Sequence, residues 1–277
     1  KNPVLVDVYW EEGAKLYNEK DYPKARELFE KIIFNFPTSS LAPQASFYRS
    51  EALFLEEKYQ EAAVAYEGFL QSYKEDAQRN LAMFHLAVSR YNLKQFPEAA
   101  QTFELFAQTF PKDPLAQNAS LNAALSYIQA QNVDEAIDAV QSYATAFPNA
   151  EDLGTAYLQL GQFLEKLGQE QKAAEIYRQT PPQRAEYPEA LYNVARVFRE
   201  IKNAPEEQRA YESLAALPNK SDPYRIAGLL QWGDLLVLQG KLPQAAAAYK
   251  DVVKNAADAE SRGRAQEQLT ALGPAAK

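Results

Sequence analysis

The sequence predicts an all-α protein, a right-handed α-solenoid of seven helix pairs with a C-terminal capping helix. Alanine, leucine, glutamate and glutamine are abundant, and these residues favour helix. Phe-Pro pairs close three amphipathic runs, at positions 36/37, 110/111 and 147/148, so their spacings are 74 and 37 residues. A fixed period of this length is typical of a repeated helix–turn–helix unit.

Small residues carry the same period inside the helices. One recurs every 37 positions in the second segment of each unit: Ala25, Ala62, Ala99, Ala136 and Ala173. Twelve positions earlier stands another small residue, which we call the contact residue of its repeat: Gly13, Ser50, Ala87, Ala124 and Gly161. A bulky residue stands four positions after each of the alanines in the second segment: Phe29, Tyr66, Phe103, Val140 and Tyr177. Glycine in a helix interior costs roughly 1 kcal/mol relative to alanine, so the two glycines predict the close approach of another backbone.

The units follow one another along the whole chain, 1–277, as a single solenoid. Short breaks containing Pro or Gly, such as "EKDYPKA" and "KLGQEQKAA", separate the two helices of a unit. The seven repeats are expected to begin near Val6, Pro43, Asn80, Gln117, Gly154, Tyr187 and Arg225. The final stretch, about 256–272, predicts one more amphipathic helix that covers the last repeat.

The sixth repeat departs from the pattern. Ala195 is its contact residue and Tyr211 its bulky residue, but Glu207 stands where the other repeats have alanine. A charged residue at this position predicts weaker packing between the two helices. Because the stability of a solenoid is roughly a sum of repeat and neighbour contributions, we expect a hinge near residues 180–220.

The pattern resembles the tetratricopeptide repeat (TPR), in which small and large residues alternate over a helix pair. The fifth repeat carries it through Tyr157, Leu160, Gly161, Leu164, Gly168, Ala173 and Tyr177. The seventh carries it through Gly233, Leu236, Gly240, Ala245 and Tyr249. The usual TPR period is 34, whereas it is mostly 37 here, with the extra residues between one pair and the next. The resemblance implies a superhelical scaffold that binds other proteins and is not an enzyme.

A finer resemblance points to bacterial envelope proteins. The stretch from "FEKIIFNFP" to "YEGFLQSY" is similar to repeats of the outer-membrane assembly lipoprotein and of the periplasmic protein that works beside the Tol-Pal system. This implies a scaffold in the periplasm or on the periplasmic face of the outer membrane. A cytoplasmic TPR adaptor remains the alternative. The start Lys-Asn-Pro, without methionine, favours a processed or trimmed N-terminus.

Composition excludes several classes of partner. The net charge is −8 and the isoelectric point about 5.0, which argues against nucleic acid because phosphate binding needs basic clusters. No run approaches 18 apolar residues, so no membrane span is expected. The chain has no cysteine, which removes disulfides and thiolate metal sites. The sequence does not indicate an oligomeric state.

The sequence indicates no catalytic, metal or cofactor site. His85 is the single histidine and is expected at a helix cap or on the surface. Adjacent carboxylates such as Glu56 and Glu57 diverge on a helix, and no glycine-rich loop could hold a phosphate. A glycan-processing helical-repeat module is the less favoured enzymatic alternative, since it needs a converging acid and base.

The candidate binding site is the concave groove formed by the first helices of repeats one to four. The expected partner is a peptide or helix of another protein, held by an exposed stripe of aromatic and aliphatic side chains. The candidate residues are Trp10, Tyr17, Phe47, Phe54, Phe84, Tyr91, Leu121 and Ile128. Simple packing between neighbouring helices explains the same residues equally well. A clamp for chaperone-tail carboxylates is excluded, because its lysine and asparagine slots hold residues such as Trp10, Ala14 and Leu81.

Overall fold

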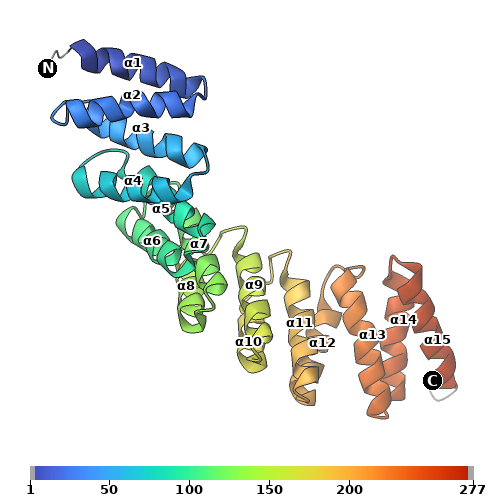
Figure 1. Ribbon diagram of the computed structural model, residues 1–277. Helices are drawn as coiled ribbons and strands as arrows, with labels where there is room; N and C mark the ends of the chain where they lie inside the picture. The colour runs from blue at the N-terminus through green and yellow to red at the C-terminus, as the bar shows by residue number, and fades with distance from the viewer. Residues whose placement is uncertain (1–3, 274–277) are drawn as a thin grey trace. The chain divides into compact units, whose positions relative to one another are not determined.

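A computed structural model describes residues 4–273, which form fifteen α-helices joined by short turns and contain no strand. Contacts between Cα atoms divide the chain into two compact units that meet at Phe147 and Pro148, and each is described by itself. Figure 1 shows successive helices of each unit lying side by side in chain order. The first unit contains α1 (Val4–Asn18), α2 (Tyr22–Asn35), α3 (Ala42–Leu55), α4 (Tyr59–Ser72), α5 (Arg79–Asn92), α6 (Phe96–Thr109), α7 (Ala116–Gln129) and α8 (Val133–Ala146).

The second unit has three helix pairs and a last unpaired helix. Its helices are α9 (Leu153–Lys166), α10 (Glu170–Tyr177), α11 (Tyr187–Glu200), α12 (Ala204–Ala216), α13 (Pro223–Leu238), α14 (Leu242–Asn255) and α15 (Ala259–Leu272). Helix α15 packs on α13 and α14 through Ala265, Leu269 and Leu272, as the capping helix was expected to do. The paired all-α architecture is therefore confirmed. The prediction of one continuous solenoid over 1–277 goes beyond either unit and stays a prediction, and residues 1–3 and 274–277 lie outside the described part.

In the first and fifth repeats the contact residue lies under an aromatic ring of the paired helix. A Cβ added to Gly13 would lie 2.9 Å from the ring of Phe29, and one added to Gly161 would lie 2.3 Å from the ring of Tyr177. The predicted close approach is thus real, but a side chain makes it rather than a backbone. The reason is visible in the pattern, since the bulky residue always stands 16 positions after the contact residue.

The turn inside each helix pair contains one residue with positive φ. In the first five pairs it recurs every 37 positions, at Lys20, Glu57, Lys94, Gln131 and Gly168. Four of these five residues are not glycine, although the left-handed conformation costs any residue with a Cβ more than it costs glycine. The backbone hydrogen bond from Asp21 to Leu16 closes the first of these turns, and the bond from Lys58 to Leu53 closes the second. The period therefore fixes the backbone conformation even where the residue does not favour it.

The Phe-Pro pairs mark the ends of even-numbered helices. Phe36, Phe110 and Phe147 are the C-cap residues of α2, α6 and α8. Each donates its backbone N–H to a carbonyl four positions earlier and then leaves the helical conformation. Proline follows directly and cannot continue the helix. Tyr73 caps α4 at the fourth position of the series.

Glu207 in the sixth repeat does not leave a packing defect. Its side chain is buried, and its carboxylate lies 3.2 Å from the Nε of Arg199. Ala195 and Tyr211 are both fully buried, so the expected loss of packing between them is not seen. The arginine supplies the counter-charge that a buried carboxylate requires. The hinge near 180–220 stays a prediction about flexibility.

Candidate protein-binding site

The first helices of the repeats are the odd-numbered helices, and they form one face of each unit, which we call the odd-helix face. Helix α3 contacts α5, α11 contacts α13, and α13 contacts α15. The eight candidate residues occupy two recurring positions on this face. Trp10, Phe47, Phe84 and Leu121 stand three positions before the contact residue, and Tyr17, Phe54, Tyr91 and Ile128 stand four positions after it.

The position before the contact residue faces the core. Phe47 is only 4% exposed, and its ring centroid lies 5.7 Å from that of Phe69. Phe84 is half-buried against Phe103 and Phe106 of α6, with centroids 5.5 and 5.6 Å away. Trp10 and Leu121 are also half-buried. The expected stripe of six exposed rings is therefore wrong at Phe47, because residues three apart on a helix share a face and the contact residue faces the paired helix.

The position after the contact residue is open to solvent on one side. Tyr17, Phe54 and Ile128 are half-buried, and Tyr91 is 37% exposed. The ring of Tyr17 lies 5.2 Å from that of Tyr48 on the next odd helix. The ring of Phe54 stacks on His85 at 4.6 Å with an interplanar angle of 4°. These rings link successive odd helices and still present one surface to a partner.

A polar cluster lies beneath this aromatic surface. The Oε1 of Glu51 lies 2.7 Å from the Nδ1 of His85 and accepts a hydrogen bond from the hydroxyl of Tyr66. Burial raises the pKa of the Tyr66 hydroxyl, and the Glu51 carboxylate raises it further. His85 thus joins α3 to α5 and neither caps a helix nor lies on the open surface, contrary to expectation. The signal was present in the sequence, since Glu51 directly follows the contact residue Ser50.

On the odd-helix face of the second unit, arginines join successive odd-numbered helices, in addition to one ring contact between Tyr192 and Tyr224. Arg196 of α11 pairs with Glu165 of α9 at 2.7 Å, and Arg264 of α15 pairs with Asp234 of α13 at the same distance. Arg199 donates hydrogen bonds to the hydroxyl of Tyr211 and to the side chain of Gln231. Every one of these cations already has an acceptor from the chain itself. This face therefore offers fewer unpartnered groups than the face of the first unit.

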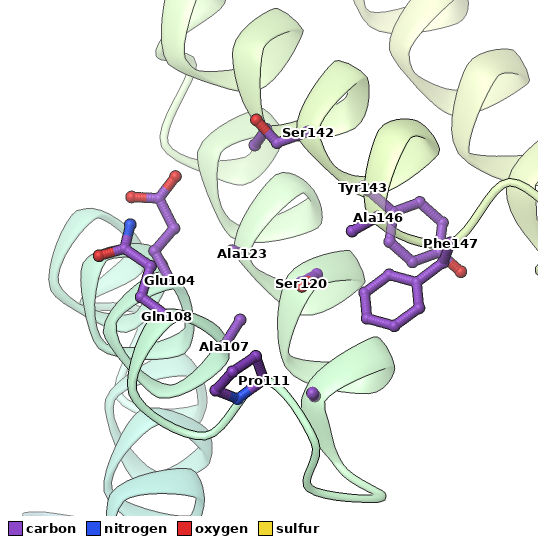
Figure 2. Close-up of a pocket in the computed structure, with 12 residues that line it drawn as sticks. Glu104, Ala107, Gln108, Pro111, Ser120, Ala123, Ser142, Tyr143, Ala146 and Phe147 are labelled. Carbon is purple, nitrogen blue, oxygen red and sulfur yellow. The ribbon is translucent and has the colours of Figure 1, made fainter.

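Two cavities lie away from the odd-helix face, each between two even-numbered helices. The one in the first unit has a volume of about 310 Å³ and lies between α6 and α8, with α7 as its floor. Figure 2 shows Glu104 and Gln108 on one side of it and Tyr143 and Phe147 on the other. The one in the second unit has a volume of about 410 Å³ and is lined by α12, α13 and α14. Sequence reasoning found neither, because it considered only the first helix of each pair.

Residues 4–273 contain no candidate metal site and no candidate membrane span. No group of three or more histidine, aspartate or glutamate side chains in this part of the chain could hold a metal ion. Within the same residues, no helix has the length and apolar character needed to cross a membrane. The binding role of the eight candidate residues stays a prediction.

Comparisons with known proteins bear on the repeats themselves. Profiles described as tetratricopeptide repeat match residues 12–77 and 86–151, and a further profile of that description matches 155–180, together more than half of the chain. No curated protein matches the sequence. The similar solved structures share a low sequence identity with this chain but cover most of its length.

Three of these structures illustrate the likeness. A tetratricopeptide repeat protein from Parabacteroides merdae is 14% identical over 96% of this chain and 98% of its own, with a TM-score of 0.50. A chain in the structure of Naa15/Naa10 bound to HypK-THB is 16% identical over 96% of this chain, with a TM-score of 0.55, and the present chain spans 39% of its length. MamA from Desulfovibrio magneticus RS-1 is 16% identical over 64% of this chain and 93% of its own, with a TM-score of 0.48. At these identities the likeness concerns the fold alone.

Proposed function

Because the chain belongs to the tetratricopeptide repeat family, we propose that it is a non-enzymatic scaffold that binds a peptide or helix of a partner protein along the odd-helix face of its first unit. Proteins of this family generally act in protein–protein interaction and are usually non-catalytic. The partner would contact Trp10, Tyr17, Phe54, Phe84, Tyr91, Leu121 and Ile128. Phe47 takes no part, because its side chain belongs to the core.

The half-exposed rings of α1, α3 and α5 are the observation that supports this site. Aromatic side chains dominate binding hot spots, since they bury a large area at a low cost in side-chain entropy. Tyr91 is the most accessible of them, and its ring contacts only Phe96 among the described aromatic rings. A substitution of Tyr91 should therefore affect partner binding with the least effect on the stability of the fold.

Site-specific photo-crosslinking tests the proposed face. A photoreactive amino acid at position 91 should crosslink a partner in the native host, whereas the same group at Gln101, exposed on α6, should not. Tyr91→Ala should weaken capture of that partner about 30-fold, which corresponds to about 2 kcal/mol, with the free energy of unfolding nearly unchanged. Equal crosslinking at both positions, or full capture by Tyr91→Ala, would contradict the proposal.

The compartment belongs to the same proposal. We assign the scaffold to a bacterial envelope assembly, in the periplasm or on the periplasmic face of the outer membrane. The resemblance of residues 29–73 to envelope repeats supports this assignment. Fractionation of the native organism with an antibody to the chain should recover it with the envelope. Recovery with the cytoplasm would favour the adaptor alternative and would leave the binding face to be judged by crosslinking.

A further inference from the structure

The cavity between α6 and α8 is lined by small residues of the fourth repeat at positions where the neighbouring repeats have large ones. Ala123 stands one position before the contact residue Ala124, and Ala116 stands eight positions before it. Both line the cavity, together with Ala107 and Ser120 (Figure 2). We call this cavity the even-helix groove. Its full lining is Glu104, Ala107, Gln108, Pro111, Ala116, Ser120, Ala123, Ala139, Ser142, Tyr143, Ala146 and Phe147.

The other repeats have different residues at the two positions equivalent to Ala116 and Ala123. Repeats two, three and seven hold an arginine at one of them, namely Arg49, Arg79 and Arg225. Repeats five and six hold large apolar or aromatic residues at both. Among repeats two to seven, only the fourth has alanine at both positions. The alanine pair is therefore specific to the interface between the third and fourth repeats. The cavity of the second unit lies at the equivalent place between α12 and α14, but there the two positions hold Trp232 and Arg225.

Arg49 shows how a guanidinium can be held there. Its Nε donates to the Oε1 of Glu30 on the preceding even helix at 2.8 Å. Glu104 stands 74 positions after Glu30, which is two periods, so it occupies the same place on α6. Ala123 stands 74 positions after Arg49. The interface between the third and fourth repeats thus has the carboxylate without the arginine that faces it in the second repeat.

The other two arginines identify a second set of acceptors. Arg79 donates to the backbone carbonyls of Leu70 and Tyr73, at the end of α4. Arg225 donates to the equivalent carbonyl of Ala215, at the end of α12. The C-terminal end of a helix attracts cations because its last carbonyls lack helical partners. The corresponding helix end next to the fourth repeat is that of α6, and the side chain of Ala116 has no group that could donate to its carbonyls.

Glu104 is available for a charged partner. Its Oε2 accepts a hydrogen bond from the hydroxyl of Tyr127 at 2.8 Å, which leaves the carboxylate its other oxygen. Over residues 4–273 no cation forms an ion pair with it. Burial raises the pKa of Tyr127, and the hydrogen bond to Glu104 raises it further. Glu104 is half-buried at the wall of the groove, where a charge-assisted hydrogen bond is stronger than in water.

We propose that the even-helix groove binds an arginine side chain from a segment of a partner protein. The guanidinium would pair with Glu104 as Arg49 pairs with Glu30, and the apolar stem would lie on the alanines of α7 and α8. A planar guanidinium matches a carboxylate better than an ammonium does, so arginine should be preferred to lysine. The site goes beyond the proposed function, because it lies between even-numbered helices and shares no residue with the odd-helix face.

A blocked pentapeptide, acetyl-Ala-Leu-Arg-Leu-Ala-amide, tests the inference by calorimetry or NMR titration to about 1 mM. The matched peptide with citrulline in place of arginine keeps the shape and removes the charge. We expect the arginine peptide to bind at least tenfold more tightly than the citrulline peptide, and more tightly than the lysine peptide. Equal binding of arginine and citrulline peptides would show an apolar groove only and would overturn the proposal. So would the absence of binding, or equally tight binding of free arginine amide.

Variants of the chain locate the site. Glu104→Gln should weaken binding of the arginine peptide about tenfold or more, since it removes the charge and keeps the acceptor for Tyr127. Asp138→Asn is the matched control, because Asp138 is exposed on α8 and outside the groove, and it should leave binding unchanged. Ala123→Arg should fill the groove as Arg49 does and abolish binding in a folded chain.

Folding of each variant is checked by circular dichroism. If Ala123→Arg does not fold, Ser120→Met takes its place, because Met83 already occupies that lattice position in the third repeat. Full binding by folded Glu104→Gln or by a folded groove-filling variant would overturn the proposal. Crosslinking at position 91 does not depend on these results, so either idea can fail without the other.

Discussion

The same lattice position joins successive odd-numbered helices in both units, but with different chemistry. In the first unit the residue four positions after the contact residue is a ring in repeats one to three, and in the first two of these it lies on Tyr48 or His85 of the next odd helix. In the second unit the equivalent residue of the sixth repeat is Arg199, which donates to Gln231. The difference teaches that the repeat fixes where two helices touch and leaves open how they do so. A face of rings keeps a surface for a partner, whereas a face of ion pairs satisfies itself.

The tyrosines of the even-numbered helices show what both units share. Tyr66 donates its hydroxyl to Glu51 in the first unit, and Tyr177 and Tyr249 donate theirs to Glu165 and Asp234 in the second. Burial raises the pKa of each of these hydroxyls, and the carboxylate raises it further. The core is therefore built alike in both units. Only the groups that face these carboxylates differ, histidine in one unit and arginine in the other.

The largest expected difference between the units concerns their buried arginines. Arg225 is only 1% exposed and pairs with Asp251 at 2.8 Å, whereas Arg79 is half-buried and donates to two carbonyls. Asp251→Asn should cost about 3 kcal/mol of unfolding free energy, because it leaves a buried charge without its counter-charge. Arg79→Met should cost about 1 kcal/mol, the value of ordinary hydrogen bonds. Urea denaturation measures both, and equal losses would contradict the comparison.

The contribution of the Arg225–Asp251 pair to stability should also depend on pH. The hydrogen bond from Arg225 holds the pKa of Asp251 below its usual value of 3.8. A lowered folded-state pKa means that the contribution is present above pH 3.8 and is lost as the pH falls below it. The difference in stability between the wild type and Asp251→Asn should therefore shrink below that pH.

The next largest expected effect concerns the close contact between the contact residue and the aromatic ring of the paired helix. Gly161→Ala places a methyl group against the fully buried ring of Tyr177 and should cost about 2 kcal/mol. In the first unit Ala87 already has a Cβ at this position, so Ala87→Gly should cost only about 1 kcal/mol, the helix propensity of glycine. Hydrogen exchange of the helices flanking each site locates the loss. A neutral Gly161→Ala would mean that the ring moves aside freely.

Salt should separate the two kinds of contact. Double-mutant cycles are expected to give about 1 kcal/mol for Phe54 with His85 and about 0.5–1 kcal/mol for Arg196 with Glu165 at low ionic strength. In 1 M NaCl the second coupling should fall by more than half, because mobile ions screen partly exposed charges. The coupling energy between Phe54 and His85 should stay nearly unchanged in the same salt. A ring pair that weakened as much as the ion pair would remove the distinction between the two faces.

The smallest effect concerns the turns. Gln131→Gly should stabilise the chain by about 0.5–1 kcal/mol, since Gln131 has a φ of 60°. Gly168→Ala, one period later in the second unit, should destabilise it by a similar amount. Melting temperatures of the two variants should move in opposite directions. Shifts in one direction would mean that the turn residues act through contacts and not through their backbone conformation.

Periodicity predicted most of the fold, because each repeat solves the same packing problem with residues at the same spacing. Helix pairs, breaks, the capping helix and the close approach at Gly161 all follow from positions that can be counted in the sequence. The residue that approaches Gly161 could also have been predicted from the spacing, since Tyr177 stands 16 positions later. Expecting a backbone there underestimated how far an aromatic ring reaches.

Burial on the odd-helix face could not be predicted in the same way. Phe47 and Phe54 are seven residues apart on α3, and such residues point in nearly the same direction from a helix. One is buried and the other half-exposed because different neighbours cover the two parts of the helix. The sequence of α3 alone cannot show what Phe69 or His85 covers. The even-helix groove was missed for a related reason, since it depends on small residues from three helices at once.

The contacts described above also say how the chain is organised in sequence. Gln231 also donates a hydrogen bond to the hydroxyl of Tyr192, 39 positions away in the sequence, and the side-chain hydrogen bonds named above span fewer positions. A structure that closes only such short loops has a low contact order, and chains of this kind fold quickly. Each helix pair needs only its neighbours, so ordering can begin at any repeat and spread in both directions. During synthesis, the first pairs can therefore pack while later ones are still being made.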